Sequence, residues 1–321
     1  MSAPSGSGPK VSVIVVAPEL NDFGRRCLDG LLALREETEL IFVPDHAPSE
    51  PLDERIAVVP SGSGLTTGGK RQIGLERASG EIVALIDDDA YPHPSWLRNA
   101  VATLDEDPAI AAVCGPTLTP PDDSELEILG GRVYASPLVS GPANWRYTLA
   151  DPADVDDAPS VNLVIRRSEA VAIGFDSEDK WGEDTLFCEE LLRRGGRIRY
   201  EPAVIVYHSR RPLWKPHLRQ LYRWSRHRSA YARTVGGNSR NPSYFAPSAL
   251  LLFLLAGLVL RGRARSLHRL GVAIYLLACL AGGYDRSPGR WLRLSGAIVA
   301  SHLVYGFGFL RGILGADPVR D

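Results

Sequence analysis

The chain has 321 residues and a formal net charge of −2, which is enough length for one large domain or two smaller ones. Its four cysteines are scattered, without the close pairs of a zinc site or the spacing of a disulfide framework. The composition therefore argues against both classes and fits a reducing compartment.

Charge is divided unevenly along the chain. Residues 1–206 contain 18 Lys and Arg against 35 Asp and Glu, whereas residues 207–321 contain 18 against 3. An acidic front part thus precedes a basic and apolar rear part. This pattern predicts a soluble domain on a membrane-facing tail.

The front part begins with a small, polar stretch, residues 1–9, which is predicted to be a disordered leader. The first apolar run, Val11 to Ala17, is too short for the core of a signal peptide, so the front part is expected to remain in the cytoplasm. The same run is continuous and rich in β-branched residues, which predicts a buried parallel strand.

Strand and helix patterns then alternate. Further strands are predicted at residues 39–43, 56–59, 82–86, 110–114, 161–165 and 204–207. Helices are predicted at residues 22–35, 68–79, 95–104 and 184–194, the last ended by Gly195 and Gly196. The alternation predicts a doubly wound α/β domain with ligands at the carboxyl ends of its strands. Residues 116–159 show little periodicity and are predicted to hold loops and an acceptor-side insertion.

Three consecutive acids, Asp87 to Asp89, follow the predicted strand at 82–86 in the stretch ALIDDDAYP. Like charges near a buried strand are costly, so the stretch is either a solvated turn or a place for a divalent cation brought by a phosphate ligand. Nearby patterns favour the second reading. Asp45, at the end of the second strand, can accept hydrogen bonds from a nucleotide base or ribose. Gly68 to Arg71 opens a helix and can offer N–H groups and positive charge to phosphates.

Two more polar positions lie farther along the chain. Glu183 and Asp184 stand at the start of the predicted helix at 184–194, and His208 follows the last predicted strand. The helix macrodipole alone favours acids at a helix start, so a simple N-terminal charge pair remains an alternative for Glu183 and Asp184.

After His208 the chain is basic, with nine Lys and Arg and no acid up to Arg240. Uncharged runs follow at residues 241–260, 270–284 and 294–310. Because about 20 helical residues span a hydrocarbon core, the first and third runs are predicted to be membrane helices and the second is marginal. Arginines flank the second run on both sides, so the topology stays open. Three buried helices of a soluble domain are the alternative.

Taken in order, these motifs resemble those of family 2 glycosyltransferases of the GT-A fold, over roughly residues 10 to 233. They match the family's Pro-x-x-Asn loop, the second acid after strand two, the arginine of the glycine-rich stretch, the DxD motif and the Glu-Asp pair. The matching positions are Pro18, Asn21, Asp45, Arg71, Asp87, Asp89, Glu183 and Asp184. The chain departs from the family at Pro44, in place of an acid, and at Gln72, in place of an asparagine.

The resemblance implies a role for each position. The donor-binding residues it implies are Pro18, Glu19, Asn21, Asp45, Arg71, Asp87 and Asp88. It implies that Asp89 and His208 hold Mg²⁺ or Mn²⁺, which neutralises the diphosphate of the donor. It also implies that Asp184, beside Glu183, is the general base for the acceptor hydroxyl in an inverting transfer.

Gln220, Arg223 and Trp224 form a QxxRW pattern, which members acting on membranes and growing polymers carry on an interfacial helix. Together with the hydrophobic runs, the pattern most resembles the branch of membrane-bound succinoglycan-type glucosyltransferases. The resemblance implies that these three residues contact the acceptor or its diphosphate.

The predicted architecture is therefore an α/β, GT-A catalytic domain with a Rossmann-like, mostly parallel sheet, followed by an amphipathic interfacial helix and C-terminal transmembrane helices. The predicted boundaries are 10–212 for the catalytic domain, 213–240 for the basic interfacial region, 241–314 for a membrane region with two to three hydrophobic helices, and 315–321 for a tail.

The predicted function is that of a metal-dependent, inverting hexosyltransferase at the cell membrane, with its catalytic domain in the cytoplasm. A UDP-sugar is the expected donor, a polyprenyl-linked glycan the expected acceptor, and membrane lipids the expected partners, with no nucleic acid. Three alternatives stay open: a processive polysaccharide synthase subunit, which would need more spans or a homo-oligomer; a catalytically degenerate membrane scaffold; and a nucleotidyltransferase, which leaves the Glu-Asp pair and the tail unexplained.

Overall fold

The computed structural model describes residues 10–175, 182–234 and 236–315, so the predicted leader and nearly all of the predicted tail lie outside the described residues. The chain divides into two compact units. Unit 1 comprises the residues up to Leu118 together with Leu149–His208, and unit 2 comprises Thr119–Thr148 together with the residues from Ser209 onward.

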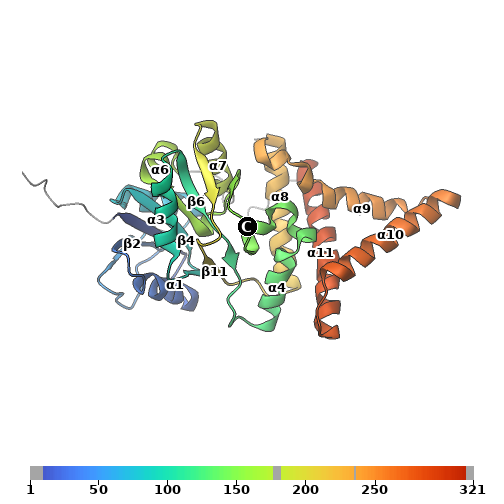
Figure 1. Cartoon of the computed structure of the whole chain (residues 1–321), viewed down its shortest axis with the longest axis horizontal. Helices are drawn as coiled ribbons and strands as arrows, with labels where there is room; N and C mark the ends of the chain where they lie inside the picture. Colours follow the sequence, from blue (N-terminus) through green and yellow to red (C-terminus); the bar gives the residue numbers. More distant parts are fainter. Residues whose placement is uncertain (1–9, 176–181, 235, 316–321) are drawn as a thin grey trace, which may run out of the picture. The chain divides into compact units, whose positions relative to one another are not determined.

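Unit 1 is built on a mostly parallel sheet of eight strands, in the order β3-β2-β1-β4-β9-β6-β10-β8. Figure 1 labels β2, β4 and β6 of this sheet. The strands are β1 Val11–Val16, β2 Thr38–Val43, β3 Ile56–Val58, β4 Ile82–Asp87, β6 Ile110–Cys114, β8 Ala153–Val155, β9 Leu163–Arg166 and β10 Arg197–Tyr200. β9 runs antiparallel to its neighbours β4 and β6, and β8 runs antiparallel to β10. A small second sheet pairs β5 (Ala90–Pro92), β11 (Val206–His208) and β7 (Thr117–Leu118). The predicted α/β fold class is confirmed.

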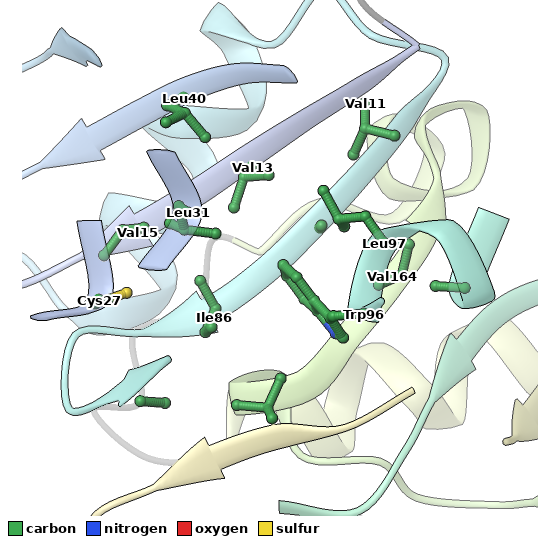
Figure 2. Close-up of a cluster of buried hydrophobic side chains, with 14 of the residues drawn as sticks. Val11, Val13, Val15, Cys27, Leu31, Leu40, Ile86, Trp96, Leu97 and Val164 are labelled. Atoms are coloured by element: carbon green, nitrogen blue, oxygen red, sulfur yellow. The ribbon is translucent and has the colours of Figure 1, made fainter. Parts of the chain in front are cut away.

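Helices cover both faces of the large sheet because its central strands are apolar on both sides. Val13 and Val15 of β1 face the cluster formed with α1 (Asp22–Leu32) and α3 (Trp96–Glu106), as Figure 2 shows. Ile14 points to the other face, where α2 (Thr67–Arg77) packs so closely that a Cβ on Gly74 would lie 2.5 Å from Ile14. The alternation of one strand's side chains thus sets the two helical layers.

Two further helices, α6 (Arg167–Ile173) and α7 (Glu183–Arg193), pack against β9 and β10. The predicted end of α7 at two glycines is confirmed. Gly195 has a φ of +88°, its N–H donates to the Leu192 carbonyl, and the Gly196 N–H donates to the Leu191 carbonyl. This pair of bonds is a Schellman motif, whose left-handed residue favours glycine.

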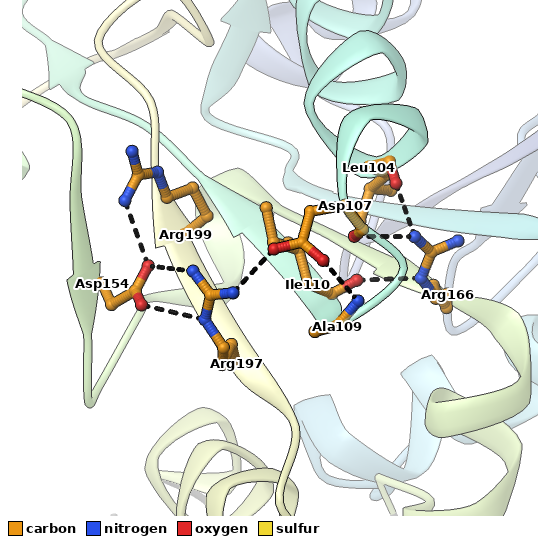
Figure 3. A network of polar contacts seen from close by, with 8 residues as sticks. All are labelled: Leu104, Asp107, Ala109, Ile110, Asp154, Arg166, Arg197 and Arg199. Carbon is orange, nitrogen blue, oxygen red and sulfur yellow. Dashed lines mark hydrogen bonds and ion pairs between the residues drawn. The ribbon is translucent and has the colours of Figure 1, made fainter.

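A polar network fixes the amino end of β6 and the neighbouring edge strands (Figure 3). Arg166 Nε donates to the carbonyl of Ile110 at 2.8 Å, and its Nη2 donates to that of Leu104. Arg197 pairs with Asp107 at 2.7 Å and with Asp154 at 2.9 Å. The carboxylate pairs are solvent-exposed and contribute little stability, so the arginine that satisfies backbone carbonyls matters more.

Unit 2 is helical. Its helices are α4 Glu125–Ala135, α5 Pro137–Ser140, α8 Lys215–Thr234, α9 Ala246–Ala256, α10 Gly262–Gly282 and α11 Pro288–Ile313. Short 3₁₀ turns lie at Gly141–Tyr147, Gly237–Arg240 and Pro242–Tyr244, and a further one, Ser160–Asn162, precedes β9 in unit 1. α4, α8 and α9 all pack on α11.

The structure corrects two expectations for these segments. Residues 116–159 contain the helix α4, whose start carries the capping box Ser124–Glu127, a sequence signal for a helix that the weak periodicity concealed. The uncharged run 241–260 yields an 11-residue α9 because Pro242 lies in a 3₁₀ turn before it and the helix ends before Gly257. The run judged marginal instead lies in the 21-residue α10, which starts inside the Arg-rich segment at Gly262. By length and composition alone, α10 and α11 are able to cross a membrane.

Asn162 provides a test of how unit 1 is held together. Its fully buried side chain accepts a hydrogen bond from Trp96 Nε1 at 2.8 Å and donates to the carbonyls of Val204 at 2.8 Å and Pro116 at 3.3 Å. Asn162→Ala leaves these buried groups without partners, so we expect the free energy of unfolding to fall by about 3 kcal/mol in denaturant titrations.

The matched control is Asn99→Ala, since the Asn99 amide donates to the Ala203 carbonyl at an exposed position. Its loss should cost less than about 1 kcal/mol because water replaces the protein partner. Equal losses in the two variants would show that Asn162 is not a buried hub.

Candidate active site

The candidate site lies at the carboxyl edge of the parallel strands. In the register of the sheet, Val16 of β1 stands opposite Val43 of β2 and Asp87 of β4. The loops that leave these strands therefore begin side by side, and the Asp45 N–H donates to the Pro18 carbonyl at 3.0 Å. The predicted donor-binding positions of three separate motifs thus meet at one edge, as expected for such sheets.

Arg71 joins two of these motifs. It lies on α2 with only 4% of its side chain exposed, and its Nη2 donates to Asp87 at 2.7 Å while its Nη1 donates to Glu183. Burial acts to lower the pKa of Arg71, but the carboxylates of Glu183 and Asp87 outweigh it and raise the pKa. Burial raises the pKa of Asp87, against the effect of Arg71. The guanidinium is thus the charge that allows two carboxylates to meet near the core.

Glycine at position 68 makes this contact possible. A Cβ on Gly68 would lie 2.3 Å from the Phe175 carbonyl and 3.3 Å from the Glu183 Cβ, so a larger residue would push α2 away from the start of α7. Gln72, a departure from the family pattern, fills a structural role beside it. Its Oε1 accepts a hydrogen bond from the Phe175 N–H at 3.0 Å.

Lys70, beside Arg71, organises the loop after β2. Its buried Nζ donates to the Ala17 carbonyl at 2.8 Å and pairs with Asp45. Thr66 caps the same helix by accepting from the Gly69 N–H at 3.0 Å. Both cations of the glycine-rich stretch are therefore neutralised by protein carboxylates, and their role as a phosphate cradle stays a prediction.

The turn after β4 carries the remaining acids toward His208. Asp88 and Asp89 form the turn into β5, which pairs with β11 so that His208 stands opposite Ala90. His208 Nε2 lies 3.1 Å from Asp89 Oδ1. Within the described part of the chain, no group of three or more His, Cys, Asp or Glu is placed to hold a metal ion alone. A carboxylate and an imidazole still fit Mn²⁺, with phosphate and water oxygens left to complete the shell.

Cys27 lies beneath this turn, with its Sγ 3.6 Å from the Asp87 carbonyl oxygen. Burial raises the pKa of the thiol, and the charges of Asp88, Asp87 and Asp89 raise it further. Cys27 is therefore a packed, protonated thiol and does not offer a thiolate ligand.

Asp184, at the start of α7, has the properties of a base. It accepts from the N–H of Thr185 at 2.8 Å and from that of Ser160 at 3.4 Å. Burial, Glu183 and Asp157 raise the pKa of Asp184 to about 6. Asp157 is itself held by the Thr185 hydroxyl at 3.2 Å. A carboxylate with this pKa is ionised at neutral pH yet basic enough to accept a proton.

The loop after β1 is more open. Pro18 and Glu19 are exposed, and the exposed Asn21 caps α1 by accepting from the Gly24 N–H at 3.0 Å. Asn21 thus has a structural role whether or not it contacts a donor.

The QxxRW residues lie on α8 in unit 2. Gln220 Oε1 accepts a hydrogen bond from the Tyr134 hydroxyl at 3.1 Å, and the Trp224 ring lies 5.6 Å from the Tyr134 ring. Arg223 lies between them in sequence and is partly buried. Tyr134 comes from α4, so the segment that lacked periodicity positions the motif.

The sequence did not reveal Lys70 as the partner of Asp45, Asp157 as a neighbour of the base, or Tyr134 as the support of Gln220. Each contact links residues far apart in the chain, and no local spacing marks it. The capping box of α4 would have been the one available signal for Tyr134, since it places that residue on a helix.

The chain matches the family model described as Glycosyl transferase family 2 over residues 12–129 and that described as Glycosyl transferase family group 2 over residues 82–284. The second match covers more than half of the chain. The chain therefore belongs to the family 2 glycosyltransferases, and the predicted family and enzyme class are confirmed.

Two curated proteins are similar to this chain. The chain is 26% identical over 290 residues to a pre-mycofactocin glycosyltransferase of Mycobacterium tuberculosis, across 87% of this chain and 58% of that protein. It is 24% identical over 213 residues to a succinoglycan biosynthesis protein of Rhizobium meliloti, across 63% of this chain and 61% of that protein. The chain thus spans about three-fifths of the length of these relatives.

A solved structure shares the fold. A mannosyltransferase of Pyrobaculum calidifontis, in complex with GDP-Man and Mn²⁺, aligns with a TM-score of 0.63 at 17% identity, across 96% of this chain and 88% of that one. The similarity supports the GT-A fold predicted from the motifs.

The raised pKa of Asp184 predicts a pH dependence of stability. The folded pKa of about 6 lies above the ordinary value of about 4, so in this window the folded protein holds a proton that the unfolded chain releases. The free energy of unfolding should therefore fall as pH rises from about 4 to about 6, and this part of the fall should disappear in Asp184→Asn.

Denaturant titrations across this pH range measure the difference between the wild type and the variant. Asp29→Asn, at an exposed position on α1, is the matched control and should keep the wild-type pH slope. An unchanged slope in Asp184→Asn would contradict a raised pKa for this carboxyl.

Proposed function

We propose that the protein is an inverting, metal-dependent hexosyltransferase that transfers a sugar from a nucleoside-diphosphate donor to a membrane-held acceptor. The observation that carries the proposal is the buried cation Arg71, which joins the DxD aspartate Asp87 to Glu183, the neighbour of Asp184. Two motifs that the reaction requires, one for the donor and one for the acceptor hydroxyl, are thereby held at one edge of the sheet.

The donor is expected to bind over the carboxyl ends of β1, β2 and β4. Asp45 and Asp87 would accept hydrogen bonds from the nucleoside, and Asp89 with His208 would hold Mg²⁺ or Mn²⁺. When bound, the ion neutralises the charge that develops on the departing diphosphate. GDP-Man and Mn²⁺ in the structural neighbour support a donor and ion of these classes, and a UDP-sugar is the expected donor for this chain.

Asp184 would take the proton from the acceptor hydroxyl. That oxygen attacks the anomeric carbon from the side opposite the diphosphate, a new carbon–oxygen bond forms, and the electron pair of the broken bond leaves with the diphosphate. The configuration at the carbon inverts in this single displacement, and no covalent enzyme intermediate is required. The pKa of about 6 suits Asp184 to this role at neutral pH.

The acceptor is proposed to be a polyprenyl-linked glycan at the cytoplasmic face of the cell membrane. Trp224 offers a ring for sugar stacking, Gln220 an amide, and Arg223 a charge for a lipid diphosphate. The basic segment from His208 to Arg240 would attract anionic headgroups. The relative named as a succinoglycan biosynthesis protein supports a glycan as the acceptor.

Turnover of purified protein in detergent tests the proposal. We would supply UDP-, GDP- and dTDP-sugars with Mn²⁺ or Mg²⁺ and a polyprenyl-phosphate lipid extract, and measure release of the nucleoside diphosphate. One donor should be turned over in a metal-dependent manner. Asp184→Asn should lower kcat by about 100-fold or more, because a positioned base contributes a factor of that order.

The variants separate the roles. Asp184→Asn should retain donor affinity, whereas Asp89→Asn should weaken donor binding and raise the metal concentration needed. The rate should rise with pH around pH 6 as Asp184 loses its proton. Nucleotide binding without turnover on any acceptor, unchanged by Asp184→Asn, would favour the scaffold alternative.

A further inference from the structure

The two helices of sufficient length and apolarity to cross a membrane differ in what surrounds them. In the most apolar 18-residue stretch of α10, 6% is buried inside the protein, whereas in the corresponding stretch of α11 the share is 44%. On α10, Leu270, Ile274 and Leu277 are each more than half exposed. On α11, Ala297 and Phe309 are buried by other helices. Length and hydropathy alone therefore do not distinguish these two helices, although one is exposed and the other is packed.

α11 is packed against the basic helix α8 along much of its length. A Cβ on Gly308 would lie 2.1 Å from the Ser225 hydroxyl, and one on Gly312 would lie 1.8 Å from that of Ser229. Small residues on both helices thus bring the two backbones close together. Nearer the middle of α11, Ser301 bonds the buried His217 of α8 at 3.1 Å. The first turns of α11 pack on α4, through Leu294 and Ala297.

This packing opposes a membrane crossing by α11. A helix that crossed the hydrocarbon would take α8 with it. The Lys and Arg of α8 are Lys215, Arg219, Arg223, Arg226, Arg228 and Arg233. A charged side chain is costly at the centre of a membrane helix, so the pair α8–α11 is far more stable at the headgroup layer.

α9 and α10 have the opposite character. They lead away from α11 as two arms that approach each other at one end (Figure 1). At that end His268 Nε2 lies 3.0 Å from the Phe253 carbonyl oxygen, and a Cβ on Gly271 would lie 2.9 Å from the Phe253 ring. We call residues 246–282 the α9–α10 hairpin. Its outward apolar side chains include Leu252, 54% exposed, and Leu258, 83% exposed.

Resting on the membrane attachment in the proposed function, we propose that the α9–α10 hairpin is the membrane-inserted element and that α11 lies with α8 in the headgroup layer on the catalytic side. The occupant of the exposed apolar surface is the lipid bilayer. Arginines at both ends of α10 argue for lipid over a second copy of the chain, because anionic headgroups lie at both ends of a spanning segment. These arginines are Arg261, Arg263, Arg265 and Arg269 at one end and Arg286, Arg290 and Arg293 at the other.

For α10, length and charge agree with this placement. The uncharged part of α10, residues 270–282, rises about 20 Å, and arginine side chains that extend toward the headgroups make up the remainder of a core of about 30 Å. The basic residues also set the orientation. Thirteen Lys and Arg, nine in residues 208–240 with Arg286, Arg290, Arg293 and Arg311, lie on the catalytic side in this placement, against four at the start of α10, from Arg261 to Arg269. The two arginine-rich segments, Arg261 to Arg269 and Arg286 to Arg293, therefore lie on opposite sides of the membrane in this placement.

Cysteine labelling tests the proposal directly, because all four native cysteines are buried and give a low background. Single cysteines would replace Ser266 near the start of α10, Gly289 at the start of α11, and Leu314 after its end. Gly289 has open space for a Cβ, and Leu314 is 84% exposed. Val171→Cys, 57% exposed on α6, is the reference for the catalytic unit. The full chain would be reconstituted in vesicles that contain anionic phospholipid and treated with a membrane-impermeant maleimide.

We expect Gly289→Cys and Leu314→Cys to react to the same extent as Val171→Cys in intact vesicles. Ser266→Cys should react only after detergent opens the vesicles. If Leu314→Cys and Gly289→Cys are labelled from opposite sides of the membrane, α11 crosses it and the proposal is overturned. Ser266→Cys on the side of Val171→Cys, or failure of the protein to float with the vesicles, would also overturn it.

Donor turnover, measured on the same preparations, keeps the two proposals apart. The four positions lie outside the candidate site, so each variant should retain turnover if the proposed function is correct, whatever the topology. Loss of turnover in the parent protein would count against the proposed function alone, since the labelling pattern does not depend on it.

Discussion

The candidate site depends on one buried guanidinium. Arg71 reaches Asp87 at the end of β4 with one nitrogen and Glu183 at the start of α7 with another. Without it, two carboxylates would meet in a poorly solvated place, and their repulsion together with their desolvation would oppose the fold. The run of acids directly after a buried strand is stable because Arg71 supplies one positive charge from within the protein. A divalent ion, bound together with the donor diphosphate, would supply further positive charge on the solvent side.

Other features follow from this contact. Gly68 is needed because α2 approaches the start of α7 so closely, and Gln72 secures the same approach through the Phe175 N–H. Glu183, once held by Arg71, fixes the first turn of α7 and thereby the position of Asp184. Burial, with the charges of Glu183 and the neighbouring Asp157, then raises the pKa of Asp184 to about 6. The proposed catalytic role of Asp184 and the local fold thus depend on one ion-pair network.

Much of unit 1 could be predicted from the sequence, because its signals are local. The continuous apolar run at Val11–Val16 has the composition of a strand buried on both faces, and the pair Gly195-Gly196 marks a helix end. The mostly parallel sheet and the edge that carries Asp87 followed from these signals and from the family resemblance, whereas the strand order came from the structure. The contact of Arg71 with Glu183, 112 residues away, could not be predicted, because no local pattern records which distant carboxylate a buried cation meets. For the same reason the short strands β5 and β7, which exist through pairing with β11, went unseen.

The rear part shows the limits of hydropathy more clearly. The uncharged runs were found, but their helices start and stop where prolines, glycines and tertiary contacts dictate, so the first run gave a short helix and the second a long one. Likewise, α4 and its Tyr134 were hidden in a segment whose apolar periodicity is weak, and their importance appears only where Tyr134 contacts Gln220. Hydropathy also does not separate a helix exposed to lipid from one packed on a basic partner.

A double-mutant cycle on Arg71 and Glu183 tests the central claim most directly. The free energy of unfolding would be measured by denaturant titration for Arg71→Met, Glu183→Gln and the double variant. Each single change leaves a buried charge without its partner and should cost about 3 kcal/mol or more, while the double variant should lose far less than the sum of the two. Additive losses, within about 0.5 kcal/mol, would contradict the account, because they would show that the two side chains do not depend on each other.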